Sequence, residues 1–244
     1  MQFLGTVFRT ILYQPLLNVL VLLYLYLPGH DFGVAVIVLT VLIKLVFYPL
    51  GAKAIESQRA LSSIQPKIKE IQEKYKDDKE QQTKEMMNLY KQEKINPFSG
   101  CLPILIQLPV LIALYRVFWT GLSPEQMTLL YNFVPSPGVI NSMFLGIIDL
   151  AAPNIILAVL AGILQFIQIR TSTTPVKIKK GSGVSDHMQK QMQFFMPVFM
   201  IVILFRLPSA IGLYWVTTTI FTIIQQYVIL KKKKYDNGGE LTKS

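Results

Sequence analysis

Residues 32–50 read FGVAVIVLTVLIKLVFYPL, an apolar run that contains a single charged residue, Lys44. A hydrocarbon core about 30 Å thick is crossed by about 20 apolar residues in a helix, so this run is long enough to span a bilayer. At about 1.5 Å per residue, Lys44 would lie about 18 Å from Phe32 and about 12 Å from the opposite face. A lone charge at such depth usually faces a bundle interior or a wet cavity. We therefore expect a cavity beside Lys44; the alternative is a lysine that extends to the inner headgroups.

The rest of the chain alternates between apolar and charged segments. Charges are nearly absent from four further segments, at 101–122, 154–169, 191–205 and 209–230, and crowd between them. This pattern is typical of a helical membrane protein. Together with residues 32–52, it predicts five spans.

The net charge of +10 comes from 24 Lys and Arg against 14 Asp and Glu. Ten of the basic residues lie in 51–100, five in 170–190 and five after residue 230, whereas 121–153 has none. Basic segments of a membrane protein stay on the cytoplasmic side, so we expect the N-terminus outside and the C-terminus in the cytoplasm. Because the charges follow this membrane rule, they do not indicate DNA binding.

Two segments outside the spans have helical character. We expect Pro15 to interrupt the N-terminal stretch, which leaves a short apolar run at residues 16–27. This run favours an interfacial helix, with a sixth span as the alternative. Residues 55–95 place apolar side chains at helical spacing on both sides of a polar turn at 76–78. They predict a cytoplasmic helical hairpin, with Pro66 near a helix start or a kink.

Polar side chains recur inside the expected spans. They are Thr40, Lys44, Gln107, Gln165, Gln168 and the threonine run 217–219 with Thr218 at its centre. Each costs free energy in hydrocarbon unless it is hydrated or paired, so we expect them to line one shared wet indentation. No acidic residue lies inside the apolar segments 32–52, 101–122, 154–169, 191–205 and 209–230, so Lys44 has no partner there.

Catalytic chemistry is not indicated. The chain has one cysteine and two histidines, and it lacks a Gly-rich phosphate loop, a nucleophile motif and a paired-carboxylate constellation. We expect no enzyme activity, no catalytic residue, no metal and no cofactor.

Three runs together resemble a known family: LSSIQPKIKEIQEKYKDD at 61–78, NPFSGCLPILIQLPVLIALY at 96–115 and GLYWVTTTIFTIIQQ at 212–226. With Lys44, the single basic residue of the run 32–50, they are similar to the YidC-type membrane protein insertases of the YidC/Oxa/Albino family, in the short form that lacks a large extracytoplasmic domain. In that family the basic residue is typically arginine. Lysine keeps the charge but loses the planar hydrogen-bonding fork.

The resemblance implies a membrane protein insertase and chaperone of the bacterial plasma membrane. Its groove would be open to cytoplasm and lipid, and nascent membrane proteins would enter it without nucleotide hydrolysis. Gln168 would match the third-span glutamine of the family, and Trp215, beside Tyr214, its last-span aromatic residue. The hairpin and basic tail would contact the ribosome, targeting factors or the Sec translocon.

The expected fold is therefore an all-α membrane protein: a five-transmembrane-helix bundle with a cytoplasmic helical hairpin and an N-terminal interfacial helix. The expected parts are the interfacial helix (1–30), first span (31–54), hairpin (55–96), second span (97–122), extracytoplasmic loop (123–153), third span (154–170), cytoplasmic loop (171–190), fourth span (191–207), fifth span (208–230) and basic tail (231–244). Two other functions stay open. One is a small anion or solute transporter with Lys44 as its anion site, and the other is a membrane-complex assembly factor.

Overall fold

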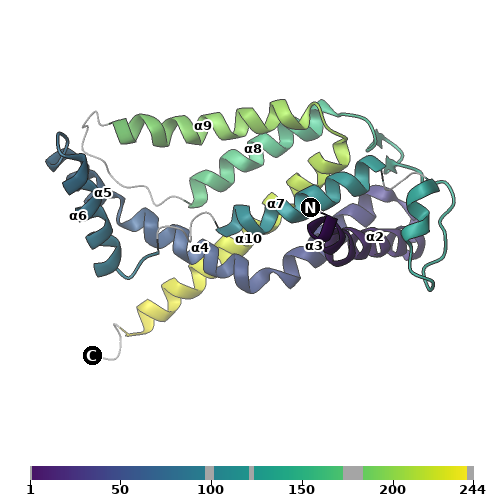
Figure 1. The fold of residues 1–244 in the computed structure, drawn as a ribbon, viewed down its shortest axis with the longest axis horizontal. Coiled ribbons are helices and arrows are strands. Elements are labelled where there is room, and N and C mark those ends of the chain that lie inside the picture. Colours follow the sequence, from purple (N-terminus) through teal and green to yellow (C-terminus); the bar gives the residue numbers. More distant parts are fainter. Residues whose placement is uncertain (1, 97–101, 121–123, 173–183, 241–244) are drawn as a thin grey trace. The chain divides into compact units, whose positions relative to one another are not determined.

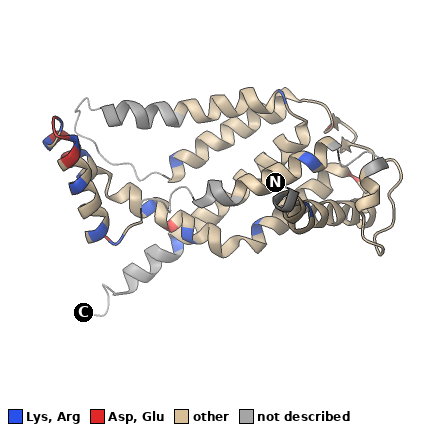
Figure 2. Cartoon of the chain, viewed as in Figure 1, with Lys and Arg blue, Asp and Glu red and all other residues tan. Residues whose placement is uncertain are grey.

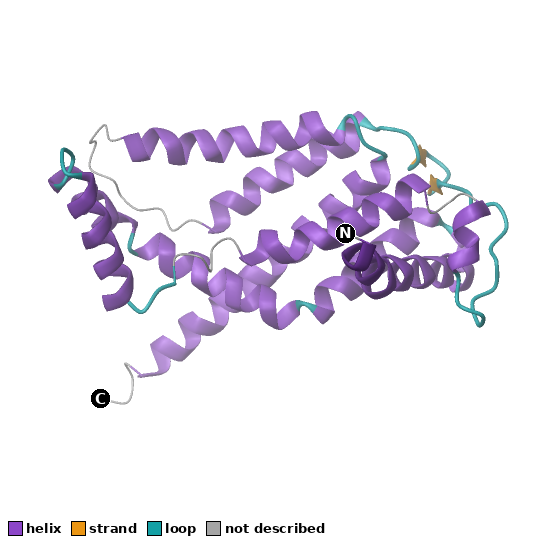
Figure 3. Cartoon of the chain, in the orientation of Figure 1, coloured by secondary structure: helices purple, strands orange, loops and turns teal. Residues whose placement is uncertain are grey.

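A computed structural model describes the backbone of residues 2–96, 102–120, 124–172 and 184–240, and the side chains of 5–96, 107–119, 126–172 and 194–231. Within these ranges the secondary structure is almost entirely helical, with one pair of two-residue strands (Figures 1 and 3). The prediction of an all-α chain is confirmed. The NPFSGC motif after Asn96, most of the loop 171–190 and the tail side chains after Lys231 lie outside the described residues.

The elements follow in this order: α1 Gln2–Phe8, η1 Arg9–Tyr13, α2 Gln14–Tyr26, η2 Pro28–His30, α3 Phe32–Val46, α4 Tyr48–Ser63, α5 Gln65–Lys74, α6 Lys79–Gln92, α7 Leu102–Thr120, η4 Pro124–Leu129, β1 Met143–Phe144, β2 Ile148–Asp149, α8 Ile155–Ser172, α9 Val184–Leu204 and α10 Ser209–Glu240.

Several helices have the length and apolar composition of membrane spans. Within the described residues these are Gly5–Tyr26, Ile155–Ser172 and Ser209–Lys231, and a fourth if α3 and α4 count as one broken span. The apolar helices Gln107–Trp119 and Phe194–Leu204 are shorter. Lys, Arg, Asp and Glu gather instead on α4, α5 and α6 (Figure 2). A multi-pass helical membrane protein is supported, and the count of five spans stays a prediction.

Pro15 does not interrupt the N-terminal helix, contrary to our expectation. The turn before it, Arg9–Tyr13, is a π-helix, in which the Gln14 N–H donates to the Arg9 carbonyl. A proline lacks its own N–H and crowds the carbonyl four residues earlier. The wider π turn accommodates that defect, and α2 continues to Tyr26.

The expected first span, 31–54, consists of two helices. Helix α3 ends at Val46, Phe47 leaves the helical region with φ −89° and ψ 10°, and α4 begins at Tyr48. Pro49 explains the break, because it cannot donate to the Leu45 carbonyl and its ring crowds that oxygen. Lys44 therefore lies in the last turn of α3.

The chain forms two compact units, which we describe separately. The first consists of Met1–Phe47, Ile104–Gln165 and Pro197–Phe221, and the second of Tyr48–Pro103, Phe166–Met196 and Thr222–Ser244.

The core of the first unit comes from α2, α3, α7, α8 and α10. Its most buried large side chains include Leu17, Phe32, Leu114 and Tyr214. A Cβ atom added at Gly162 in α8 would lie 2.5 Å from the Ile201 side chain, so only glycine permits this approach to α9. Small residues at such contacts are typical of helices that associate within lipid.

Helix α2 is bound to the connection between α7 and α8 along much of its length. The Tyr13 hydroxyl donates to Gln126 (2.8 Å), and the Tyr24 hydroxyl accepts from the Asn141 N–H (3.1 Å). Between them Asn18, which is 1% exposed, accepts from the Tyr131 N–H at 2.7 Å. Polar bonds thus tie the end of η1 (Tyr13) and α2 to residues 126–141 at three points.

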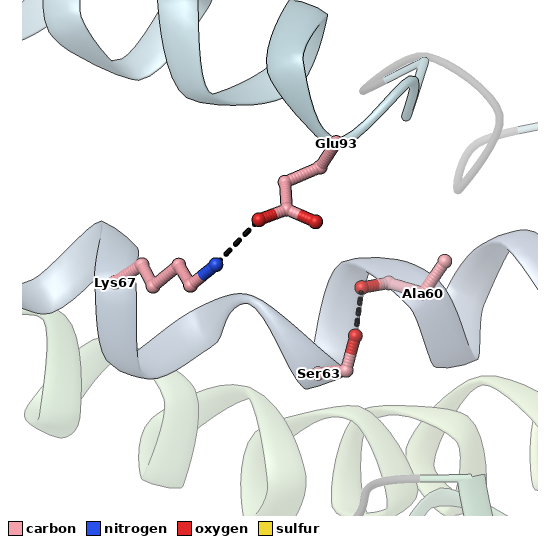
Figure 4. Close-up of polar contacts among 4 residues, drawn as sticks. All are labelled: Ala60, Ser63, Lys67 and Glu93. Carbon is pink, nitrogen blue, oxygen red and sulfur yellow. Dashed lines mark hydrogen bonds and ion pairs between the residues drawn. The ribbon is translucent and has the colours of Figure 1, made fainter.

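In the second unit, α5 and α6 pack on each other through Ile64, Ile68 and Leu89. The polar turn between them covers residues 75–77. Pro66 occupies the first turn of α5, which confirms its expected position at a helix start. Figure 4 shows an exposed ion pair across the two helices, Lys67 to Glu93 at 2.5 Å, and the Ser63 hydroxyl donating to the Ala60 carbonyl (2.8 Å) at the end of α4.

Candidate functional site

Lys44 is half-buried, and its ammonium lies over the aromatic ring of Phe221 in α10, 6.0 Å from the ring centroid. The negative face of an aromatic ring attracts a cation without removing its charge. Among the described residues, no carboxylate lies within 4.0 Å of this ammonium. Its neighbours Leu45 and Val46 are 53% and 74% exposed. Lys44 is thus a cation without a counter-ion beside an apolar, accessible helix end.

Thr40 lies one turn before Lys44 on α3 and is buried. Its hydroxyl donates to the carbonyl of Val36 at 2.6 Å. This bond satisfies the hydroxyl within its own helix, as is common for threonine in apolar helices. Thr40 therefore does not require water.

Gln107 and Tyr214, both predicted site residues, contact each other. The Gln107 amide in α7 donates to the Tyr214 hydroxyl. Tyr214 is 1% exposed, so this bond stabilises a polar group that lies inside the packed unit.

One face of α10 connects these contacts. Tyr214, Thr218 and Phe221 are spaced i, i+4 and i+7 and therefore share a face. Gln107 of α7 contacts Tyr214, and Lys44 of α3 contacts Phe221. The two contacts are about 10 Å apart along the axis.

A second pair joins α10 to α8. The Trp215 indole N–H donates to the side-chain oxygen of Gln165 at 2.8 Å. Both side chains are half-buried. The indole can donate only this one hydrogen bond, so the pair satisfies its only polar group.

Gln168 belongs to the second unit, unlike the other predicted residues. Its carbonyl accepts from the hydroxyls of Thr171 and Ser172. Whether its side chain belongs with the others stays a prediction, as does the shared wet indentation.

Sequence reasoning missed Phe221 in the first unit and Gln225 and Gln226 in the second. Phe221 gives no signal of its own among the apolar residues of its span. Gln225 and Gln226 were visible at the end of the apolar run, and both are almost fully buried. Gln225 donates to the Tyr48 carbonyl (3.0 Å), next to the helix break, and Gln226 donates to Ser172 (2.6 Å).

This arrangement offers electrostatic attraction and hydrogen bonding. Within the described residues, no group of three or more His, Cys, Asp or Glu could hold a metal ion. The site comprises the Lys44 ammonium, which has no carboxylate beside it among the described residues, and a row of polar side chains in apolar helices. Together, the fold and this set of residues define a multi-pass helical membrane protein with a polar, positively charged element among its spans.

The chain belongs to the 60Kd inner membrane protein family, whose model matches residues 23–237. It is similar to proteins named Membrane protein insertase YidC. One, from Fusobacterium nucleatum subsp. nucleatum, is 36% identical over 203 residues, which are 83% of this chain and 87% of that protein. Those from Francisella philomiragia subsp. philomiragia and Francisella tularensis subsp. novicida are 36% and 37% identical over 201 residues, 82% of this chain. The matched part is 33% of each Francisella protein.

Proposed function

We propose that this protein inserts nascent membrane proteins into the bacterial plasma membrane and assists their folding, without nucleotide hydrolysis. The observation that carries the proposal is the 36% identity, over 83% of the chain, to a relative named as a membrane protein insertase. The uncompensated Lys44 cation in α3 supports it, because such a group suits transient contact with acidic client segments.

In the proposed mechanism, a short hydrophilic segment of the client enters a hydrophilic groove that is open to cytoplasm and lipid. Lys44 attracts its acidic side chains, since the Coulomb attraction is strong where the local dielectric constant is low. The Phe221 ring stabilises the ammonium without neutralising it, so the cation stays available.

The driving force in this mechanism is the transfer of the client's apolar segment from water to lipid. Each buried methylene contributes about 0.8 kcal/mol, so a span of about 20 residues needs no coupled hydrolysis. Membrane potential adds about 2.3 kcal/mol per charge for each 100 mV. The protein only lowers the barrier for the polar part.

For the topology, we propose that α2 lies along the outer membrane surface. Its bonds to the Leu129 carbonyl near one end and to the Asn141 N–H near the other would otherwise place an irregular connection inside the hydrocarbon core. Exposed irregular backbone is not tolerated at that depth. This favours the interfacial helix over a sixth span, although Gly5–Tyr26 is long enough to cross.

The pair α5 and α6 would then be a cytoplasmic hairpin. Residues 51–100 carry ten basic and eight acidic side chains, a balance that suits a solvated protein-binding element. With the basic tail, it would contact the ribosome, targeting factors or the Sec translocon.

The test is insertion into liposomes of a small client with an acidic translocated segment, scored by protease protection. We expect Lys44→Arg to retain insertion, Lys44→Ala to reduce it and Lys44→Glu to reduce it most. Lys53→Glu is the matched control, because Lys53 is an exposed lysine on α4. Equal insertion by Lys44→Glu and wild type would refute the role of Lys44.

The same variant separates the two other functions. An anion transporter would conduct in liposomes without a client and lose that flux in Lys44→Glu. An assembly factor would retain insertion in this variant but lose a co-purifying partner. An insertase passes no ion current under the same conditions.

A further inference from the structure

The connection between α7 and α8 carries an exposed apolar hairpin tip, which we call the outer tip and define as Leu145, Gly146 and Ile147. It joins strands β1 and β2, which pair antiparallel (Figure 3). Leu145 is 63% exposed and Ile147 79% exposed. Two large apolar side chains at the end of a connecting segment are unfavourable in water and typically mark a contact surface.

The backbone of the outer tip is held in a defined conformation. Leu145 and Gly146 have positive φ angles of 52° and 68°, the left-handed region that a non-glycine residue rarely occupies. The Ile147 N–H donates to the Phe144 carbonyl at 3.0 Å, and the Leu145 N–H donates to Asp31 at 2.5 Å. Since both N–H groups have acceptors inside the protein, moving the tip out of water leaves neither unpaired.

Asp31 also fixes the outer tip to the point where α3 begins. One carboxylate oxygen accepts from the Val34 N–H (2.9 Å) and caps α3, while the other binds the Leu145 N–H. A Cβ atom at Gly33 would lie 2.1 Å from the Phe144 ring, so β1 packs directly on the first turn of α3.

The far side of the hairpin is bound to the start of α10. The Ser209 hydroxyl donates to the Asp149 carbonyl (3.0 Å), and the Ala210 N–H donates to the Leu150 carbonyl (3.0 Å). The outer tip is therefore held at the level where α3 and α10 both begin.

Exposed apolar surface continues from the hairpin onto α8. Asn154 caps this helix by accepting from the Ile156 and Leu157 N–H groups. The first two residues of α8, Ile155 and Ile156, are 49% and 67% exposed, as expected for a lipid-facing span. Residues 121–153 contain no Lys or Arg, so no basic charge of this connection has to be desolvated.

We propose that Leu145 and Ile147 insert into the headgroup and acyl boundary of the bilayer leaflet on the side where α3, α8 and α10 begin. The lipid surface is the occupant that the geometry favours, because hydrogen bonds hold the backbone of the outer tip, its connection lacks basic charge, and the tip lies at the helix ends, where α8 also begins with exposed apolar side chains. It acts as an interfacial anchor that holds this end of α3 at a fixed depth. The proposal does not depend on the insertion activity.

Site-directed spin labelling tests the proposal, because Cys101 is the only native cysteine. In a Cys101→Ser background, a nitroxide is attached at Ile147→Cys, with Leu145→Cys as a second position. Exposed Glu80 on α6 gives the water reference (Glu80→Cys), and Ile156→Cys gives the lipid reference. Each variant is reconstituted in phosphatidylcholine and phosphatidylglycerol vesicles, and its collision rates with oxygen and with a water-soluble nickel chelate are measured.

We expect the ratio of oxygen to nickel collision rates at 145 and 147 to be closer to the value at 156 than to that at 80. A ratio equal to that at 80 would mean that the outer tip lies in water, which overturns the proposal. Low collision rates with both reagents and an immobilised spectrum would also overturn it, because the tip would then be covered by protein.

Discussion

Asn18 offers a quantitative test of how α2 is held. Its side-chain oxygen accepts from the Tyr131 N–H at 2.7 Å, and its amide donates to the carbonyls of Gln14 (2.7 Å) and Leu129 (3.2 Å). In Asn18→Ala, the Leu129 carbonyl keeps the Gln14 side chain as a donor at 3.0 Å. The Gln14 carbonyl keeps the backbone N–H of residue 18, because α2 is helical there. The Tyr131 N–H is therefore the group left without its partner.

The size of the destabilisation expected for Asn18→Ala follows from these contacts. A buried N–H left unpaired costs about 1–3 kcal/mol. The space vacated by the amide adds about 1 kcal/mol at a site that is 1% exposed. We expect Asn18→Ala to lower the free energy of unfolding by about 2–4 kcal/mol. Asn18→Leu fills the space and isolates the hydrogen-bond cost, about 1–3 kcal/mol.

The assay is equilibrium unfolding in mixed detergent micelles, followed by circular dichroism, with amide hydrogen exchange at Tyr131 as the local readout. Asn141→Ala is the control, since Asn141 is exposed and its side chain accepts only from the Met143 N–H. It should change stability by less than about 0.5 kcal/mol. If Asn18→Ala matches that control and exchange at Tyr131 does not accelerate, the buried-bond reasoning is wrong.

Three further predictions concern other contacts. Gly33→Ala should destabilise the first unit by about 1–3 kcal/mol in the same unfolding assay, because the alanine Cβ would lie 2.1 Å from the Phe144 ring of β1. An unchanged unfolding midpoint would contradict this prediction. A double-mutant cycle of Trp215→Phe and Gln165→Leu should give a coupling of about 0.5–2 kcal/mol, and additive effects would show that the bond contributes nothing. Lys67→Ala should lower the free energy of unfolding by less than about 1 kcal/mol, because the ion pair with Glu93 is exposed. This effect should disappear in high salt, and a destabilisation that does not depend on salt would indicate lost packing instead.

Local sequence patterns predicted much of the secondary structure. The apolar residues at helical spacing in 55–95 predicted helices on both sides of a polar turn, and Ile64 before α5, Ile68 in α5 and Leu89 in α6 pack together there. Pro66 predicted the start of α5. Such features depend on neighbouring residues alone. The same reasoning was wrong for Pro15, because a π turn upstream can absorb the missing N–H.

The candidate site was predicted less completely. Lys44, Gln107, Tyr214 and Trp215 were identified as polar or aromatic residues in apolar spans, but not their pairing. Phe221 could not be identified at all, because its role arises only from the position of α3 against α10.

The amino-acid sequence by itself determined that the chain is helical, that it carries spans of membrane length and that Lys44 is a charge without a counter-ion inside one of them. These properties follow from composition and periodicity, which act over a few residues. Only the tertiary structure decided that Gln107 pairs with Tyr214, that Asp31 binds the outer tip and that α2 is tied to residues 126–141. Such contacts join residues more than a hundred positions apart, and their energies depend on which helix faces meet, which no local pattern specifies.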